Sequence, residues 1–122
     1  MQTPAGVYRI EDLPLDHPAP GADRRRAIGE QCMVSHLVLD QGLVVPRHAH
    51  ENEQVSLVLE GRLRFELGEP GAPDHRFLEA GPGELVVLPP NLAHAAEVLE
   101  RAIAIDIFSP PSESTGIDTR AD

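Results

Sequence analysis

Two short stretches of this 122-residue chain contain three of its six histidines. In the first stretch, His48 and His50 are separated by one residue. Successive side chains of a β-strand point to opposite faces, so two histidines at this spacing project from the same face. Two neutral imidazoles that point at one place make half of a site for a divalent metal ion. Gln54, four residues after His50, and His94, in the second stretch, are the candidates for the remaining ligands.

The second candidate for chemistry is Asp106, which lies in the otherwise apolar stretch Ala102–Phe108. A lone carboxylate in such a stretch is costly to bury unless it is hydrogen-bonded or functional. Beside a metal ion, Asp106 would serve as a general base or acid toward a bound substrate. The alternative is a structural carboxylate, bonded to a backbone turn or to an arginine across the barrel.

Strands are the elements that have to position these side chains. Twelve prolines and ten glycines interrupt the chain, and the apolar runs between them are short and rich in Val, Ile and Leu. No stretch shows a helical period of useful length, and short strands with regular turns are typical of an all-β sandwich or barrel. The predicted strands are Met33–Leu39, Leu43–Arg47, Gln54–Leu59, Arg62–Leu67, His75–Leu78, Glu84–Leu88, Ala93–Val98 and Ala102–Phe108.

Alternation within two of these strands predicts two unlike faces. Small, polar and apolar side chains share one face, which is that of Gln54, Ser56 and Val58 and of Ala104, Asp106 and Phe108. The opposite face is apolar throughout, with Val55, Leu57 and Leu59 followed by Ile103, Ile105 and Ile107. Such faces suit a barrel with an internal cavity, whose apolar outer face packs against another sheet or a second subunit.

Charge and composition limit the partners of the chain. The formal net charge is −10 and the pI is about 4.9, which argues against nucleic acid because phosphate binding needs a basic patch. The one basic cluster, Arg24–Arg26, is expected to be a solvated loop, with contact to an anionic substrate or to a second subunit as the alternative. All ten basic residues are arginines, so Schiff-base chemistry on a lysine is excluded.

The chain is expected to form a single domain over residues 1–122. We expect an N-terminal arm over about residues 1–30, a barrel over residues 31–111 and a flexible tail over residues 112–122. The sequence shows neither the pattern of a signal peptide nor an apolar run as long as a membrane span. We therefore expect a soluble, cytoplasmic protein without a membrane partner.

The candidate metal ligands also lie in a pattern that resembles the two cupin motifs. The spacing of the first motif is matched by Gly42, His48, His50, Gln54 and Gly61, and that of the second by Gly83, Pro89, Asn91 and His94. The resemblance implies a double-stranded β-helix, that is, a cupin or jelly-roll barrel. It also implies that His48, His50, Gln54 and His94 hold one divalent metal ion.

Two positions depart from the usual cupin motifs. Gln54 stands where the family has a glutamate, and Asn91 stands where it has a turn glycine, although asparagine also tolerates a left-handed backbone. Three imidazoles and an amide oxygen carry no charge, so a bound divalent ion would keep its full charge and be a stronger Lewis acid. Zn²⁺, Ni²⁺, Mn²⁺, Fe²⁺ and Co²⁺ all remain open, because imidazole ligands do not choose between them.

Together with the Asp-x-Phe-Ser-Pro-Pro sequence that begins at Asp106, the motifs resemble the small cupins of the KdgF type. Enzymes of that family convert a 4,5-unsaturated monouronate, from pectin or alginate breakdown, into its linear ketone. The resemblance implies that Asp106 is catalytic and that Phe108 lies in the substrate site. The family pattern continues with an arginine where this chain has Ser112, so Arg47 or Arg62 would have to bind the substrate carboxylate.

Two alternatives to a sugar-acid enzyme stay open. The same ligands could hold Fe²⁺ in a dioxygenase, or the chain could be a non-catalytic cupin that binds or senses a small molecule. The neutral ligands and Asp106 favour the enzyme that acts on a small molecule such as a sugar acid. We also expect a homodimer, because the stripe of Ile103, Ile105 and Ile107 needs a cover.

Overall fold

The computed structural model describes residues 2–118, which form eight strands and, before them, one turn of 3-10 helix. The elements are η1 (Ile10–Asp12), β1 (Leu15–Ala19), β2 (Ala22–Ile28), β3 (Met33–Leu39), β4 (Val44–His48), β5 (Glu53–Leu67), β6 (Arg76–Ala80), β7 (Leu85–Leu88) and β8 (His94–Ser109). The all-β prediction is confirmed. Within the described residues, no helix has the length and apolar character that crossing a membrane requires.

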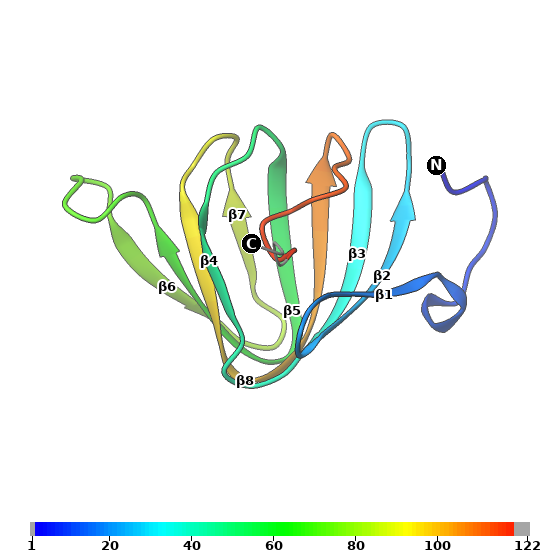
Figure 1. The fold of residues 1–122 in the computed structure, drawn as a ribbon, viewed down its shortest axis with the longest axis horizontal. Helices are drawn as coiled ribbons and strands as arrows, with labels where there is room; N and C mark the ends of the chain where they lie inside the picture. Colours follow the sequence, from blue (N-terminus) through cyan, green and yellow to red (C-terminus); the bar gives the residue numbers. More distant parts are fainter. Residues whose placement is uncertain (1, 119–122) are drawn as a thin grey trace.

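Every strand pair is antiparallel, and the two long strands β5 and β8 pair with each other along most of their length. Each of them contributes to two groups of strands. The first half of β5 and the second half of β8 lie between β7 and β3, and the sheet continues from β3 through β2 to β1. The other halves lie between β6 and β4. Figure 1 shows β6 and β4 on the left of the molecule and β3, β2 and β1 on the right.

The sequence predicted four separate strands where the structure has β5 and β8. The predicted turn at Glu60–Gly61 is instead a series of register shifts within β5. Gly61 has a φ of +82°, and a Cβ atom there would lie 2.1 Å from the backbone oxygen of Arg101 in β8. The close approach of the neighbouring backbone therefore requires glycine, and the turn signal marks a bulge in a continuous strand.

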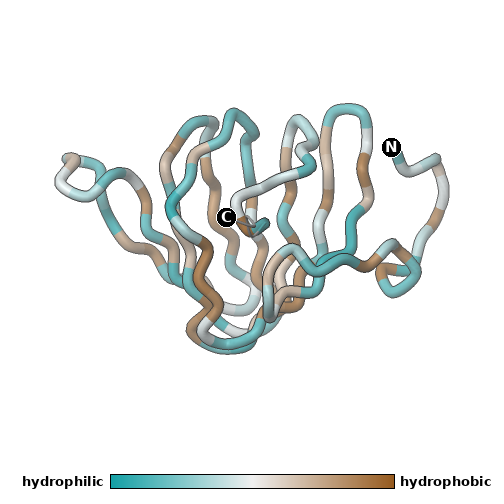
Figure 2. Tube along the Cα trace, viewed as in Figure 1, coloured by the Kyte–Doolittle hydropathy of each residue, from teal (hydrophilic) through white to brown (hydrophobic). Residues whose placement is uncertain are grey.

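The predicted faces of β5 and β8 are confirmed by the burial of their side chains. Gln54, Ser56 and Val58 are 6%, 1% and 0% exposed, whereas Leu59 on the opposite face of β5 is 41% exposed. Phe108, on the predicted inner face of β8, is also buried. Figure 2 shows the resulting alternation of hydrophilic and hydrophobic positions along the strands. The inner faces thus combine an apolar core with a polar region around Gln54.

Both ends of the chain differ from the expectation. Residues 15–19 and 22–28 of the expected arm form β1 and β2, and β2 pairs with β3 along its whole length. Arg24 in β2 is only 2% exposed, so it does not belong to a solvated loop. In the expected tail, Thr115 is buried, and Figure 1 shows the segment turning back from β8 toward the middle of the molecule. Residues 119–122 of the expected tail lie outside the described residues.

Candidate metal centre

The structure brings His48, His50 and His94 together, with one candidate ligand atom of each within 4.8 Å of the others. His48 is the last residue of β4 and pairs with His94, the first residue of β8. His50 lies in the loop after β4 rather than in a strand, and its ring centroid is 5.1 Å from that of His94. The pairing of β4 with β8 therefore joins the two motifs that are far apart in the sequence.

The backbone fixes the tautomer of all three histidines. Nδ1 of His48, His50 and His94 lies 2.8, 3.0 and 2.8 Å, respectively, from a carbonyl oxygen two residues away along the chain. A carbonyl oxygen only accepts hydrogen bonds, so each Nδ1 carries the proton and donates it. Each Nε2 is left with a free lone pair, which is the form in which imidazole binds a metal ion.

The Nε2 atoms have the surroundings of metal ligands. Those of His48 and His94 are buried and have no hydrogen-bond partner among the described residues. Nε2 of His50 faces Oε1 of Gln54 at 3.2 Å, and both atoms are acceptors in this tautomer. Two ligands that each lie about 2.1 Å from one ion are about 3.0–3.4 Å apart, so a shared cation accounts for this contact. The four residues therefore fit a divalent metal ion.

Gln54 is oriented by its neighbours on the inner face. Its Nε2 donates to Oγ of Ser56 at 3.0 Å and to Oδ2 of Asp106 at 3.4 Å. These bonds turn the amide oxygen toward the histidines. The sequence analysis did not identify Ser56 as a site residue. Its position two residues after Gln54, which places both side chains on the same face of the strand, could have indicated it.

Burial keeps two of the imidazoles neutral. Desolvation lowers the pKa of His94 to about 4, and this effect outweighs the hydrogen bond to the carbonyl of Leu92. Desolvation also lowers the pKa of His48. Since a metal ion binds only the unprotonated nitrogen, these shifts prepare both side chains for ligation at neutral pH.

Asn91 shapes the loop that leads to His94. Its φ of +66° makes it the one non-glycine residue with a positive φ in the described part of the chain. Its N–H donates to the carbonyl oxygen of His50 at 2.8 Å, which ties the two ligand-bearing loops together. Asn91 thus adopts the left-handed conformation that asparagine tolerates in place of the usual glycine.

Asp106 lies on the inner face of β8, between Ser35 in β3 and Ser56 in β5. Burial raises its pKa to about 6, against a smaller opposite effect of the hydrogen bond with Ser56. Among the described residues, its contacts are with Gln54 and Ser56 and not with an arginine. A carboxyl group with this pKa next to a ligand candidate has the properties of a general acid or base.

The other three predicted site residues lie at different distances from this centre. Phe108 is buried, and its ring packs edge-on against His50 with the centroids 5.9 Å apart. Arg47 precedes a ligand candidate but pairs with Glu66 at 2.9 Å. Arg62 pairs with Glu79 at 2.8 Å in the bulged part of β5 and is not brought to the histidines. The predicted ligands thus gather at one place, whereas the two arginines already have carboxylate partners.

A cavity of about 50 Å³ adjoins the histidines inside the barrel. It has room for a few water molecules, whereas pockets for small organic ligands typically reach about 300 Å³ or more. Its lining includes Asp106 and Gln54 and, from the C-terminal segment, Thr115 and Ile117. Sequence reasoning treated this segment as a tail, because nothing local in it reveals that it closes over the barrel.

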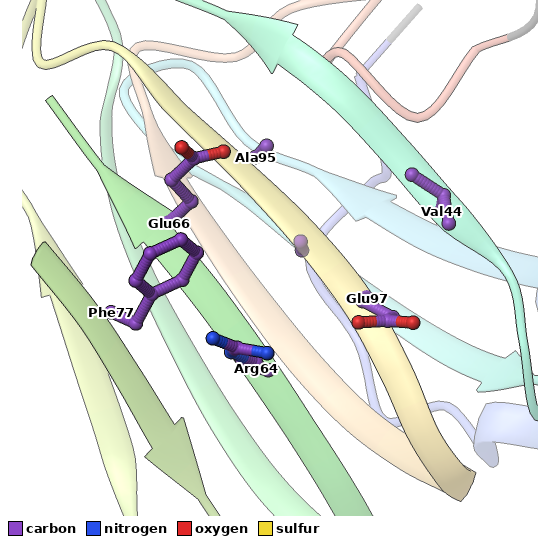
Figure 3. Close-up of a pocket in the computed structure, with 7 residues that line it drawn as sticks. Val44, Arg64, Glu66, Phe77, Ala95 and Glu97 are labelled. Atoms are coloured by element: carbon purple, nitrogen blue, oxygen red, sulfur yellow. The ribbon is translucent and has the colours of Figure 1, made fainter. Parts of the chain in front are cut away.

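A second hollow lies on the outer surface, over β4, β8, β5 and β6. It measures about 240 Å³, and its lining includes Val44, Phe77 and the charged side chains of Arg64 and Glu66. Figure 3 shows these side chains on the strand surfaces, and the guanidinium carbon of Arg64 is 4.2 Å from the centre of the Phe77 ring. No candidate metal ligand lines this hollow, so it is separate from the metal centre.

Comparisons with known proteins agree with this architecture. An RmlC-like cupin from Shewanella frigidimarina NCIMB 400 is similar over 93% of this chain and 97% of its own, with 26% identity and a TM-score of 0.80. KdgF from a Halomonas species is similar over 90% of this chain and 97% of its own, with 27% identity and a TM-score of 0.75.

A variant of oxalate decarboxylase from Bacillus subtilis, a longer protein of which 33% is covered, shares the fold at 17% identity and a TM-score of 0.79. No curated protein sequence matches the chain. The family model of the cupin domain matches residues 35–108, which contain both histidine motifs and Asp106. With the jelly-roll barrel and the three converging histidines, this match shows that the chain belongs to the cupin family.

Proposed function

We propose that this cupin is a metal-dependent enzyme that converts a 4,5-unsaturated monouronate, a small sugar acid, into its linear ketone. The observation that carries the proposal is the position of Asp106. Its carboxyl group contacts the ligand candidate Gln54 and has a pKa of about 6, so it exchanges a proton readily near neutral pH. The similarity of the whole chain to KdgF from Halomonas supports the same assignment.

His48, His50, Gln54 and His94 are the residues that would hold the metal ion, with Zn²⁺, Ni²⁺, Mn²⁺, Fe²⁺ and Co²⁺ as candidates. When bound, such an ion supplies Lewis acidity toward a substrate oxygen. The four ligands carry no charge, since Gln54 stands at the position where the usual cupin motif has a glutamate. Ser56 and Asp106 hold the Gln54 amide in place from the other side.

The proposed conversion is an isomerisation that needs two proton movements and no redox cofactor. One proton leaves the anomeric hydroxyl while the bond between the ring oxygen and the anomeric carbon breaks. One proton then adds to carbon 4 of the released enolate, which becomes the ketone. Asp106 accepts the first proton as the carboxylate and delivers the second as the acid, so it returns to its starting state.

The test follows the ultraviolet absorbance of the conjugated double bond in unsaturated monouronates from pectin and alginate. Metal-loaded protein should accelerate the loss of absorbance, and the protein treated with a chelator should not. Consumption of O₂ with a different product would favour the dioxygenase alternative. Binding of the uronates without any acceleration would favour the non-catalytic alternative.

We also propose that the chain forms a homodimer through the outer face of β3, β8, β5 and β7. Cross-strand pairing places Val34 beside Ile107, Ile107 beside Val55, and Val55 beside Val87. Of these, Val34, Ile107 and Val87 are 38%, 40% and 53% exposed. A continuous apolar row of this kind is unusual on the surface of a monomer, and a two-fold symmetric pair buries the same face of both copies.

A further inference from the structure

Two arginines of β2 lie on the inner side of the sheet, next to the row that holds Asp106. The register pairs Arg24 with Leu37 of β3, and Arg26 with Ser35 of β3, which in turn pairs with Asp106 of β8. The side chain of Arg24 is 3% exposed and that of Arg26 is 22% exposed. A sheltered pair of guanidinium groups beside a candidate active site needs anions to balance its charge.

One of the two balancing anions comes from β1. The carboxylate of Asp16 accepts two hydrogen bonds from Arg24, at 3.0 and 2.8 Å, and one from Arg26, at 3.4 Å. Asp16 follows Leu15 in a strand that pairs with β2, so the sheet itself holds this carboxylate in place.

The other anion comes from the C-terminal segment. The carboxylate of Asp118 accepts hydrogen bonds from both terminal nitrogens of Arg24, at 3.3 and 2.9 Å, and a third from the N–H of Thr115, at 2.9 Å. Arg26 donates to the backbone oxygen of Glu113, at 3.3 Å. No strand follows β8 in the described residues, and these contacts with the arginines attach the segment to the barrel.

The same segment separates the arginines from the metal ligands. Thr115 and Ile117 line the small internal cavity, whereas Glu113 and Asp118 line a larger outer hollow of about 670 Å³ together with the two arginines. A Cβ atom at Gly116 would lie 2.1 Å from Nε2 of His48, so the backbone of the segment lies against a candidate ligand atom. Movement of residues 112–118 would therefore join the two spaces into one chamber.

We propose that Arg24 and Arg26 form the binding site for the carboxylate of the substrate, and that Asp118 occupies this site until the substrate displaces it. The choice of a sugar acid as the ligand rests on the proposed function. The present cluster has two positive and two negative side chains, since Asp16 and Asp118 face Arg24 and Arg26. Removal of Asp118 leaves one uncompensated positive charge, which is the charge that a monocarboxylate balances.

The spacing fits a ligand of the size of a monosaccharide acid. Gly116 lies against His48, and Asp118, two residues later, holds Arg24. Two residues span at most about 7 Å of extended chain. A ligand whose carboxylate took the place of Asp118 at Arg24 would thus have to extend about the length of one sugar ring to reach the metal ligands.

The experiment measures the binding of D-glucuronate to the purified protein by calorimetry, with D-glucose as the uncharged comparison. Asp118→Asn should tighten glucuronate binding roughly tenfold, because a charged competitor is lost while the arginines stay. Arg26→Gln should weaken glucuronate binding by a similar factor and leave glucose binding unchanged. Asp23→Asn is the matched control, since Asp23 lies in the same strand but pairs with His17 on the surface. Asp23→Asn should bind glucuronate like the wild type.

Equal glucuronate affinity of the wild type, Asp118→Asn and Arg26→Gln would overturn the proposal. So would an equal gain in glucose affinity in Asp118→Asn, because the segment would then act as a simple cover. Turnover of unsaturated uronates is measured separately. If turnover is absent but Asp118→Asn still tightens glucuronate binding, the proposed reaction fails and the carboxylate site stands. Arg26 is used because it is less buried than Arg24, whose loss leaves two carboxylates without their main partner.

Discussion

Nε2 of His50 and Oε1 of Gln54 face each other at 3.2 Å, although neither atom has a proton to donate. The proton of His50 is on Nδ1, which donates to the carbonyl oxygen of Asn52. The amide N–H groups of Gln54 point away, toward Ser56 and Asp106. A cation between these two acceptors would account for the contact, and the Nε2 atoms of the two other site histidines, which have no hydrogen-bond partner among the described residues, could bind the same ion.

Removal of a site histidine should therefore abolish metal retention. In His50→Ala and in His94→Ala, we expect the affinity for the metal to fall by more than about a hundredfold, because even the loss of an outer partner of a ligand costs 10- to 100-fold. The measurement is metal content after dialysis, by mass spectrometry. His17→Ala is the control, since His17 is exposed and bonded to Asp23. Retention of a full equivalent of metal in His94→Ala would contradict the assignment.

Replacement of Asp106 should separate metal binding from turnover. Asp106→Asn keeps the hydrogen-bonding shape of the side chain but cannot transfer a proton, so turnover of the unsaturated uronate should fall roughly a hundredfold or more. Metal content should stay at the wild-type level, because Asp106 contacts Gln54 and not the three histidines. Unchanged turnover at full metal content would contradict the role of Asp106 as the proton carrier, and loss of the metal together with turnover would contradict the separation of Asp106 from metal binding.

Local patterns predicted the strands that alternate cleanly. Met33–Leu39 was predicted with the bounds that the structure shows, because β-branched and apolar residues there end at a turn before Gly42. Strands β1 and β2 were missed, because their Pro, Asp and Arg residues are unfavourable in isolated strands and their place depends on pairing with β3. The inward position of Arg24 depends on Asp16 and on the distant Asp118, which no local pattern reveals.

The part of the site that was predicted is the set of metal ligands, because their spacing in the sequence is enough to identify them. The spacing of the histidines and Gln54 identified the candidate ligands, and parity placed Asp106 on the same face. Gly116 and Thr115 were missed, because their role depends on a segment that returns over the barrel after β8 ends. The alternation of side chains along a strand predicts which of them face the inside of the barrel. An irregular segment has no such alternation, so its contacts cannot be predicted in this way.

Two glycines separate the effect of backbone conformation from that of a close contact. Gly42 and Gly61 both have a positive φ, but only Gly61 would bring a Cβ atom against a neighbouring backbone. Gly42→Ala should lower the free energy of unfolding by about 1–2 kcal/mol, the cost of a left-handed alanine. Gly61→Ala should cost at least about 2 kcal/mol more, because β5 and β8 must move apart. Urea unfolding measures both, and equal losses would mean that the two strands separate easily.

Disruption of the outer apolar face should change the mass in solution. Wild-type protein should show twice the 13.2 kDa of one chain in light scattering at micromolar concentration. Ile107→Glu places a charge in the centre of this face and should give the monomer mass while the fold stays intact. Val7→Glu is the control, since Val7 is fully exposed and outside the sheet. A monomeric wild type would refute the dimer.

The pH dependence of stability should report the ionisation of Asp106. Its pKa is raised from 3.8 to about 6 in the folded, metal-free protein, so the folded state holds this proton more tightly than the unfolded state. The stability that Asp106 contributes is therefore fully present below about pH 4 and is lost as the pH rises through 6. Asp106→Asn stays neutral, so it should gain stability over the wild type between pH 4 and 6, by at most about 3 kcal/mol.

The lowered pKa of His94 acts in the opposite direction, because stability is lost as the pH falls from 6.5 through about 4. This contribution is common to the wild type and Asp106→Asn, so the difference between the two proteins removes it. Urea unfolding in the presence of a chelator, at half-unit steps from pH 4 to 8, measures that difference. We expect it to rise with pH and to level off above about pH 7. A difference that is independent of pH would mean that Asp106 ionises normally and is not poised to exchange a proton with a substrate.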